Sequence, residues 1–167
     1  MQVFYIHPEN PQPRLIEQVA DLLRKDQLII YPTDTSYAFG CRLGAKDALD
    51  KLKQIRALDD KHQFTLLCRD LSEIANYAAV DNVQFKQLKA LTPAPITFIL
   101  NATKDVPKKL AHAKKKTIGI RVPSNPIAQA LLEAMDEPIL TSSLILPNRD
   151  DILDDPFEIE DLLGNQI

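Results

Sequence analysis

Short hydroxyl side chains cluster in one segment of the sequence, residues 33–36 (TDTS), which lies between two apolar runs, 28–31 and 37–41. Hydroxyl groups at the end of a strand can hydrogen-bond the carboxylate or the ammonium group of an amino acid. A second interpretation stays open: the segment is a turn in which Asp34 and Thr35 bond their own backbone.

Two arginines stand where an anion could bind. Arg56 lies at the predicted end of a helix, where its guanidinium either binds phosphate with its planar fork or complements the negative end of the helix dipole. Arg121 lies within an apolar run (117–122) that predicts a strand. A charge in such a strand needs an ion-pair partner or a bound anion. We therefore expect Arg121 to bind a ligand or to form an ion pair.

The charge is distributed unevenly along the chain. Residues 101–121 hold seven positive side chains and one negative, a net charge of +6, whereas residues 146–167 hold one positive and seven negative, a net charge of −6. The positive stretch is either a solvated loop or a contact for RNA, whose phosphates lysines neutralise. The lysines concerned are Lys108, Lys109, Lys114, Lys115 and Lys116.

Several kinds of site find little support in the sequence. The phosphate-binding loops G-x4-G-K-[ST] and G-x-G-x-x-G do not occur, so a nucleotide would be held by side chains and strand ends. The spacings C-x2-C and H-x3-H are also missing, so no metal site is predicted and we expect Cys41 and Cys68 to be buried and reduced. Ser142 and Ser143 follow a predicted strand, but without a G-x-S-x-G elbow a serine hydrolase is weakly supported.

Length and composition indicate one folded domain over residues 1–167. The chain has 167 residues, of which 45% are hydrophobic and 26% charged, and this excludes a disordered chain. The net charge of −3 excludes a globally basic nucleic-acid coat protein but not a local basic patch. No apolar run approaches the ~20 residues of a membrane span. The first residues lack the pattern of a secretory signal, so we expect a cytoplasmic protein with no membrane partner.

Hydrophobic periodicity predicts helices that alternate with strands, and hence an α/β fold whose sheet is covered by helices on at least one face. The expected helices span 14–26, 46–58, one or two segments within 74–91, and a helix that Ser124 caps and that runs through 135. The expected strands span 3–6, 28–31, 37–41, 64–68, 96–100, 117–122 and 139–141.

Several of these segments together resemble the YrdC-like superfamily, whose best-known members make threonylcarbamoyl-AMP for tRNA modification. The motifs are 31–41 (YPTDTSYAFGC), Arg56, 93–100 (PAPITFIL), 117–123 (TIGIRVP) and 138–143 (PILTSS). Within the superfamily the chain looks most similar to the YciO branch, through 4–8 (FYIHP), 64–66 (FTL), 68–71 (CRDL) and 121–126 (RVPSNP). The resemblance covers nearly the whole chain and implies a twisted mixed sheet with helices packed on it and a concave ligand-binding face.

The resemblance also implies roles for particular residues and a reaction. Thr33 and Thr35 would meet L-threonine and Arg121 would bind its carboxylate, while Arg56, Thr117 and Ser143 would line the nucleotide side. Threonine, bicarbonate and ATP would give threonylcarbamoyl-AMP and pyrophosphate, with Mg²⁺ on the phosphates as a co-substrate. The implied reaction needs no enzymic nucleophile and no tightly bound metal or prosthetic group, and we assign no catalytic residue.

The chain departs from the family pattern at several places. The family's K-x-R motif reads Gln54-Ile55-Arg56, its S-x-N motif reads Ser143-Leu144-Ile145, and Asn125 stands where relatives have a histidine. We also expect the closing strands that carry the family's S-T-[IV]-[VI]-D segment to be lacking.

Because of these departures, the sequence leaves three functions open. The first is a weak or variant threonylcarbamoyl-AMP synthase. The second is a paralogue that binds double-stranded RNA or tRNA through its basic face without adenylating threonine. The third is a protein that acts on the threonylcarbamoyl group in another reaction, such as hydrolysis. The sequence does not predict the oligomeric state.

Overall fold

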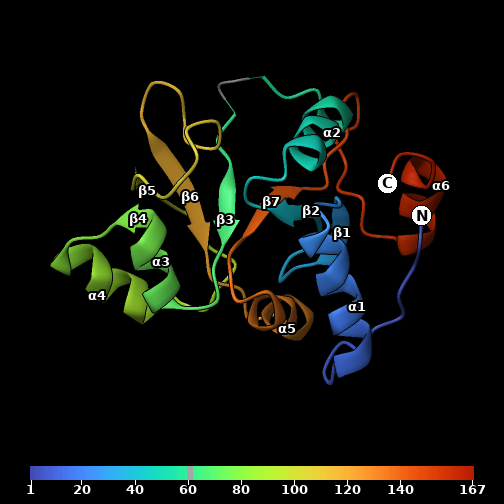
Figure 1. Cartoon of the computed structure of the whole chain (residues 1–167), viewed down its shortest axis with the longest axis horizontal. Coiled ribbons are helices and arrows are strands. Elements are labelled where there is room, and N and C mark those ends of the chain that lie inside the picture. The colour runs from blue at the N-terminus through green and yellow to red at the C-terminus, as the bar shows by residue number, and fades with distance from the viewer. Residues whose placement is uncertain (60–61) are drawn as a thin grey trace.

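A computed structural model describes residues 1–59 and 62–167, with six helices and seven strands in that part of the chain (Figure 1). The helices are α1 (Pro13–Arg24), α2 (Lys46–Arg56), α3 (Leu71–Tyr77), α4 (Asn82–Leu91), α5 (Pro126–Met135) and α6 (Pro156–Leu163). The strands are β1 (Ile29–Pro32), β2 (Tyr37–Arg42), β3 (Thr65–Leu67), β4 (Ala78–Ala79), β5 (Phe98–Ala102), β6 (Thr117–Arg121) and β7 (Ile139–Ser143).

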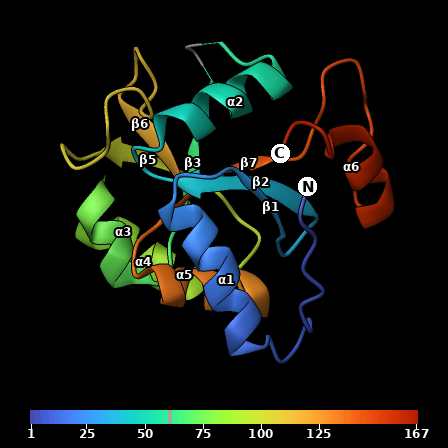
Figure 2. The same ribbon diagram turned by 45° about the vertical axis from the view of Figure 1, so that its right-hand side comes forward.

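The strands form one mixed sheet in the order β1-β2-β7-β3-β6-β5-β4, which confirms the predicted α/β fold with a mixed sheet. Only β3 and β6 pair in parallel among the described strands, and each other neighbouring pair is antiparallel. Helix α2 lies over one face of the sheet, while α1 and α5 lie on the other (Figure 2). The central strands are therefore buried on both faces over part of their length, which explains their nearly continuous apolar runs.

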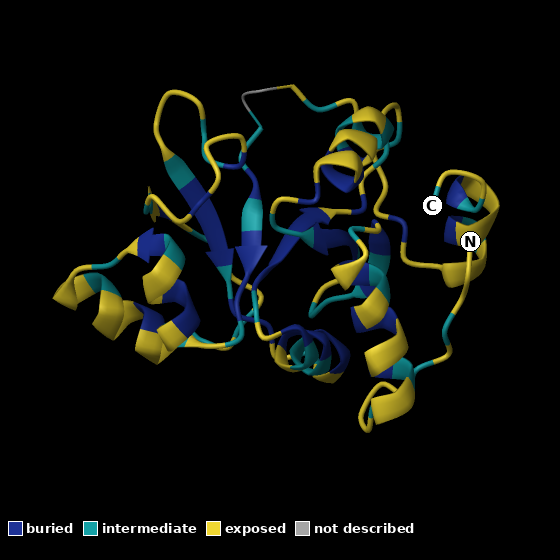
Figure 3. Cartoon of the chain, in the orientation of Figure 1, coloured by how far each residue is buried: buried dark blue, intermediate teal, exposed yellow. Residues whose placement is uncertain are grey.

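Two clusters of buried side chains fill the two faces of the sheet. One cluster joins the inner residues of α1 and α5 to alternate residues of β1, β2 and β7, including Tyr31, Ala38 and Ile139. The other cluster lies on the opposite face and joins residues of α2, α3, α4 and α6 to residues such as Phe39 and Leu66. In Figure 3, buried and exposed positions alternate along the helices, because each helix turns one side toward the core and the other toward solvent. The first cluster stops short of β6 and β5, so part of that sheet face stays open.

Both cysteines are buried and free, as expected. Burial raises the pKa of Cys41 to about 12, and burial also raises the pKa of Cys68. Neither thiol is thus poised to act as a nucleophile at neutral pH. In the described part of the chain, no helix has the length and apolar character that crossing a membrane requires.

The prediction of a strand at residues 3–6 is wrong. That segment has no regular structure and joins no strand of the sheet among the described residues. Phe4 and Ile6 pack against the cluster of α1 and α5. The strand-forming residues of this segment (VFYI) therefore pack on one side of an unpaired segment, which residue composition does not distinguish from a strand.

Two further expectations about helices need correction. Helix α5 is capped by Asn125 and not by Ser124, because the Asn125 side chain accepts hydrogen bonds from the backbone N–H groups of Ile127 and Ala128. Helix α6 was not predicted, although the Asp155 side chain accepts a hydrogen bond from the Phe157 N–H and Pro156 opens the first turn. Both features are common at helix starts, and the acidic content of the segment obscured them.

Candidate functional site

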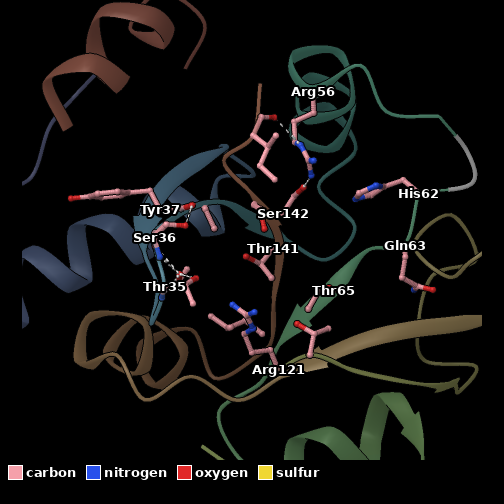
Figure 4. Close-up of a pocket in the computed structure, with 16 residues that line it drawn as sticks. Thr35, Ser36, Tyr37, Arg56, His62, Gln63, Thr65, Arg121, Thr141 and Ser142 are labelled. Carbon is pink, nitrogen blue, oxygen red and sulfur yellow. Dashed lines mark hydrogen bonds between the residues drawn. The ribbon is translucent and has the colours of Figure 1, made fainter. Parts of the chain in front are cut away.

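A cavity of about 210 Å³ lies on the part of the sheet that α1 and α5 leave open (Figure 4). Its floor comes from neighbouring strands, because Thr65 of β3 pairs with Thr141 of β7 and with Gly119 of β6. Paired residues point to the same face of a sheet, so Thr65 and Thr141 both face the cavity. The lining is rich in hydroxyl groups: Thr33, Thr35, Ser36, Thr65, Thr97, Thr141, Ser142 and Ser143.

Gly119 lets two of these hydroxyl residues approach the middle of the sheet. A Cβ atom at this position would lie 2.5 Å from Thr65 Oγ1 and 3.2 Å from Thr97 Cγ2. Real Cβ atoms essentially never lie within 3.0 Å of a neighbour, so a larger residue at position 119 would displace the Thr65 hydroxyl and crowd Thr97. The glycine of the TIGIR strand thus helps to shape the cavity.

Arg121 is the cation at the centre of the cavity floor. It stands at the end of β6, and its side chain projects toward the cavity between Thr35 and Thr65 (Figure 4). Its Nε atom is buried and has no hydrogen-bond partner in the described part of the structure. A buried, unsatisfied charged group is costly unless a ligand completes its hydrogen bonds. Arg121 therefore offers a place for an anion, and the expected ion pair is not formed among the described residues.

The segment 33–36 forms a tight turn that Thr33 holds together. The Thr33 hydroxyl donates a hydrogen bond to the Ser36 carbonyl at 2.6 Å and accepts from the N–H groups of Thr35 and Ser36 at 3.3 and 3.2 Å. The Thr35 hydroxyl makes only a 3.3 Å contact with the Thr33 hydroxyl among the described residues. Both residues line the cavity, but Thr35 has the hydroxyl that is more available to a ligand.

Asp34 does not bond its own turn, which corrects that interpretation. Its carboxylate accepts hydrogen bonds from the N–H and hydroxyl groups of Ser124 and from the N–H of Asn125, the last at 2.5 Å. In return the Asn125 side-chain amide donates to the Thr33 carbonyl. Asp34 therefore ties the turn to the segment that follows Arg121, and it fixes the two sides of the cavity relative to each other.

Arg56 lies at the opposite side of the cavity from Arg121. Its guanidinium already donates hydrogen bonds to other residues of the chain. Its Nε donates a hydrogen bond to the Ile145 carbonyl at 3.1 Å, and its Nη1 donates to the Ser142 hydroxyl at 2.5 Å. Burial lowers the pKa of Arg56, but an arginine stays protonated at physiological pH. Arg56 thus joins the end of α2 to β7 and to the segment that follows it.

His62 and Gln63 complete the same side of the cavity. The His62 ring packs edge-on against Phe64 with 4.9 Å between ring centroids, and burial together with the nearby Arg56 charge lowers its pKa. Gln63 donates a hydrogen bond to the Thr117 carbonyl at 3.2 Å and accepts one from the Thr117 hydroxyl at 3.0 Å. Thr117 is thus bound to Gln63 and does not itself line the cavity.

The predicted site residues fall into three groups. Thr33, Thr35, Arg56, Arg121 and Ser143 all line the cavity, and Thr117 lies behind Gln63. The basic residues lie elsewhere, exposed on the segment between β5 and β6: Lys108, Lys109, Lys114, Lys115 and Lys116.

The sequence analysis missed the hydroxyl residues that the strands contribute, chiefly Thr65, Thr97 and Thr141. Each stands in or just before an apolar run, which is a weak signal for a polar cavity. The Thr141 side chain is also held by a hydrogen bond: its hydroxyl lies 2.5 Å from the buried Tyr31 hydroxyl. Burial raises the pKa of Tyr31, so this phenol stays protonated and can donate. Only the pairing of distant strands brings these residues together.

The described residues include no group of three or more His, Cys, Asp or Glu side chains that could hold a metal ion. The cavity is also smaller than the roughly 300–1,000 Å³ that accommodates drug-sized ligands. Its lining of hydroxyl groups, around a guanidinium whose Nε has no partner among the described residues, suits a small polar molecule with a carboxylate, the size of an amino acid.

The fold agrees with the comparison of the chain with known proteins. The model of the Sua5/YciO/YrdC family, described as telomere recombination, matches residues 21–167, and the chain belongs to this family. The chain is 55% identical to the uncharacterised protein YciO of Escherichia coli (strain K12), over 99% of this chain and 81% of that protein. The crystal structure of E. coli YciO matches over the same shares with a TM-score of 0.95.

More distant relatives carry names that describe an activity or a ligand. The threonylcarbamoyl-AMP synthase of Vibrio vulnificus (strain YJ016) is 24% identical over 91% of this chain and 82% of that protein. The crystal structure of P. abyssi Sua5 complexed with L-threonine is 21% identical and has a TM-score of 0.77, over 86% of this chain and 42% of that one. The Sua5 likeness supports the fold alone.

Proposed function

We propose that this protein binds L-threonine in the hydroxyl-lined cavity and makes threonylcarbamoyl-AMP from threonine, bicarbonate and ATP more slowly than the synthases of its family. The unsatisfied Nε of Arg121 carries this proposal. A guanidinium can bind both oxygens of a carboxylate through two parallel N–H groups, a planar geometry that the lysine ammonium lacks. Thr35 and the threonines of the sheet would then bond the remaining polar groups of the amino acid.

The proposed reaction has two steps. The threonine amine attacks bicarbonate and water leaves, which gives a carbamate. A carbamate oxygen then attacks the α-phosphorus of ATP, and the bond to the leaving pyrophosphate breaks. The protein would contribute positioning by Arg121 and charge stabilisation by Arg56 and Ser143. Magnesium would arrive with the phosphates of ATP as a co-substrate.

Slow turnover follows from the contacts on the nucleotide side. Arg56 would have to release the Ile145 carbonyl or the Ser142 hydroxyl before it could bind a phosphate. Ile145 lines the cavity with an apolar side chain where the family motif has an asparagine, and the exposed Gln54 replaces the family's lysine. Each lost charged hydrogen bond costs about 1.5–3 kcal/mol, which corresponds to roughly ten- to hundredfold in rate.

The test is a search for threonylcarbamoyl-AMP by mass spectrometry after the protein is mixed with ATP, Mg²⁺, bicarbonate and L-threonine. A synthase of the family runs in parallel, and a reaction without bicarbonate provides the blank. We expect product that depends on bicarbonate, at a lower rate than the synthase gives. If folded protein yields no product, the synthase proposal is wrong. Consumption of added threonylcarbamoyl-AMP would instead favour a protein that acts on the threonylcarbamoyl group in another reaction, such as hydrolysis.

A second candidate function is the binding of double-stranded RNA or tRNA. It is favoured by the exposure of the five basic residues of the β5–β6 segment, Lys108, Lys109, Lys114, Lys115 and Lys116. Lysines that neutralise phosphates release counterions, so RNA affinity should fall by powers of ten between low and moderate salt. The variant K114E/K115E/K116E should weaken RNA binding and leave threonine binding intact. An RNA affinity that is independent of salt would eliminate this candidate.

A further inference from the structure

A second and larger cavity lies on the face of the sheet opposite the threonine-sized cavity. It is a groove of about 620 Å³ between the N-terminal half of α2 and residues 107–113. Its floor is apolar and includes Leu49, Leu110 and Leu140. No residue of this groove belongs to the site described above.

The rim of the groove is strongly basic. The groove is lined by one carboxylate, that of Asp50, and by five cationic side chains. The cationic residues are Arg42, Lys46, Lys53, Lys108 and Lys109. Arg42 already forms an ion pair with Asp26, with 3.1 Å between its Nε and the Asp26 Oδ1. Lys46, Lys108 and Lys109 are exposed and form no ion pair with another described residue. An apolar floor beneath unpaired lysines suits a partner that carries both acidic and apolar side chains.

The same chain presents such a surface in its acidic segment, residues 146–167. Exposed acidic residues, among them Asp154, Glu160 and Asp161, accompany apolar side chains that stay in contact with water. Phe157 is 72% exposed and Ile152 is 56% exposed. A large exposed aromatic residue surrounded by charge is typical of an interface anchor.

The acidic segment does not reach the groove of its own chain. Helix α6 and the segment between β5 and β6 lie on opposite sides of α2 in both views (Figures 1 and 2). Buried Ile159 and Leu163 hold α6 to its own core. The two complementary surfaces can therefore meet only between separate molecules.

We propose that the groove binds the acidic segment of a second copy of this chain, with Phe157 over the apolar floor and Asp154 and Asp161 facing Lys108 and Lys109. The contact joins two different surfaces, so it is heterologous and each copy keeps one free groove and one free acidic segment. Association should accordingly grow with protein concentration beyond a dimer. Because exposed charges dominate the contact, salt should weaken it.

Sedimentation velocity tests this proposal on the full chain. At roughly 20 mM salt, where the screening length is long, we expect the average mass to rise with concentration above the 18.8 kDa of one chain. At about 500 mM salt, where screening is short-ranged, we expect the monomer. A wild-type protein that remains a monomer at low salt would overturn the proposal and leave the groove to a partner of another kind.

Charge reversals identify the surfaces. K108E/K109E should weaken association by roughly tenfold or more, and so should D154K/D161K. The control K86E/K89E makes the same change in net charge on α4 and should associate like the wild type. A mixture of K108E/K109E with D154K/D161K should associate again, because each variant keeps one intact surface. Equal loss in the control, or no recovery in the mixture, would contradict the proposal; circular dichroism confirms that each variant is folded.

Discussion

Arg56 and Arg121 carry the same charge in one cavity, yet their hydrogen bonds differ. Arg56 donates to the Ile145 carbonyl and the Ser142 hydroxyl, whereas the Nε of Arg121 is buried and has no hydrogen-bond partner among residues 1–59 and 62–167. A buried charged donor gains most from a ligand when the chain does not already satisfy it. This difference is the reason why we assign the amino-acid carboxylate to Arg121. It is also the reason why we expect weak binding of the nucleotide at the side of the cavity where Arg56 lies.

The substitution Arg121→Lys tests the carboxylate assignment. Lysine keeps the charge but loses the planar pair of donors, so threonine affinity should fall by roughly tenfold or more, the scale of a hydrogen bond to a charged group. Isothermal titration calorimetry measures the change. Arg69→Lys, an identical replacement away from the cavity, should leave the affinity unchanged. Equal affinity of the Arg121→Lys variant and the wild type would show that this guanidinium does not bind threonine.

Restoring the family residues should accelerate synthesis. In the variant Q54K/I145N, a lysine can approach the phosphates and an asparagine can bond the adenylate, where now an exposed amide and an apolar side chain stand. We expect the rate of threonylcarbamoyl-AMP formation to rise by roughly tenfold or more, as measured by mass spectrometry. Gln87→Lys, on the exposed face of α4, controls for added charge. No increase in rate would mean that other features limit the reaction.

At the scale of elements, Asp34 holds together the two segments that flank the cavity. Its carboxylate accepts three backbone or hydroxyl donors of residues 124 and 125, so Asp34→Ala would leave these donors unsatisfied. We expect a loss of about 1–3 kcal/mol in the free energy of unfolding together with weaker threonine binding. Urea unfolding and calorimetry measure the two effects. Asp34→Asn, which keeps one acceptor, should recover part of both, and a fully stable Asp34→Ala variant would show that the tie is dispensable.

The start of α3 contains a buried carboxyl whose ionisation opposes folding. Glu73 is 7% exposed and accepts a hydrogen bond from the Arg69 N–H, and burial raises its pKa above the ordinary 4.5. Above that pH the unfolded chain ionises more easily than the folded one, so the charged carboxylate reduces stability at neutral pH.

Glu73→Gln keeps the acceptor and removes the charge. We therefore expect this variant to have a higher free energy of unfolding than the wild type at pH 7. The difference should disappear below pH 4.5, where the carboxyl is neutral in both states. Urea unfolding at the two pH values provides the measurement. A destabilised Glu73→Gln variant at pH 7 would mean that the ionised carboxylate contributes more through its neighbours than it costs through burial.

Elements with strong local signals could be predicted from the sequence, and elements that depend on distant partners could not. The amphipathic pattern of 14–26 corresponds to α1, and the apolar runs correspond to β1, β2, β3, β6 and β7. The segment 3–6 is also rich in strand-forming residues, but it has no strand to pair with among the described residues. In α5, only tertiary contacts distinguish the capping Asn125 from Ser124, whose backbone and hydroxyl donors bond Asp34.

For the molecule as a whole, the resemblance of the motifs predicted the α/β fold, and the match to YciO confirms it. It also directed attention to five residues that do line one cavity. The sequence could not reveal that other groups of the chain hydrogen-bond Arg56, nor that Thr65, Thr97 and Thr141 line the same cavity as Arg121. These facts depend on which strands become neighbours and on side-chain partners far apart in the chain.

The most direct test of the threonine site compares two ligands on the unmodified protein. L-Threonine and L-threoninol share the amine and both carbons of the side chain, but threoninol has an alcohol in place of the carboxylate. If Arg121 binds the carboxylate, calorimetry should show binding of threonine and an affinity for threoninol that is lower by roughly tenfold or more. Equal affinities for the two ligands, or no binding of threonine to the folded protein, would contradict the account.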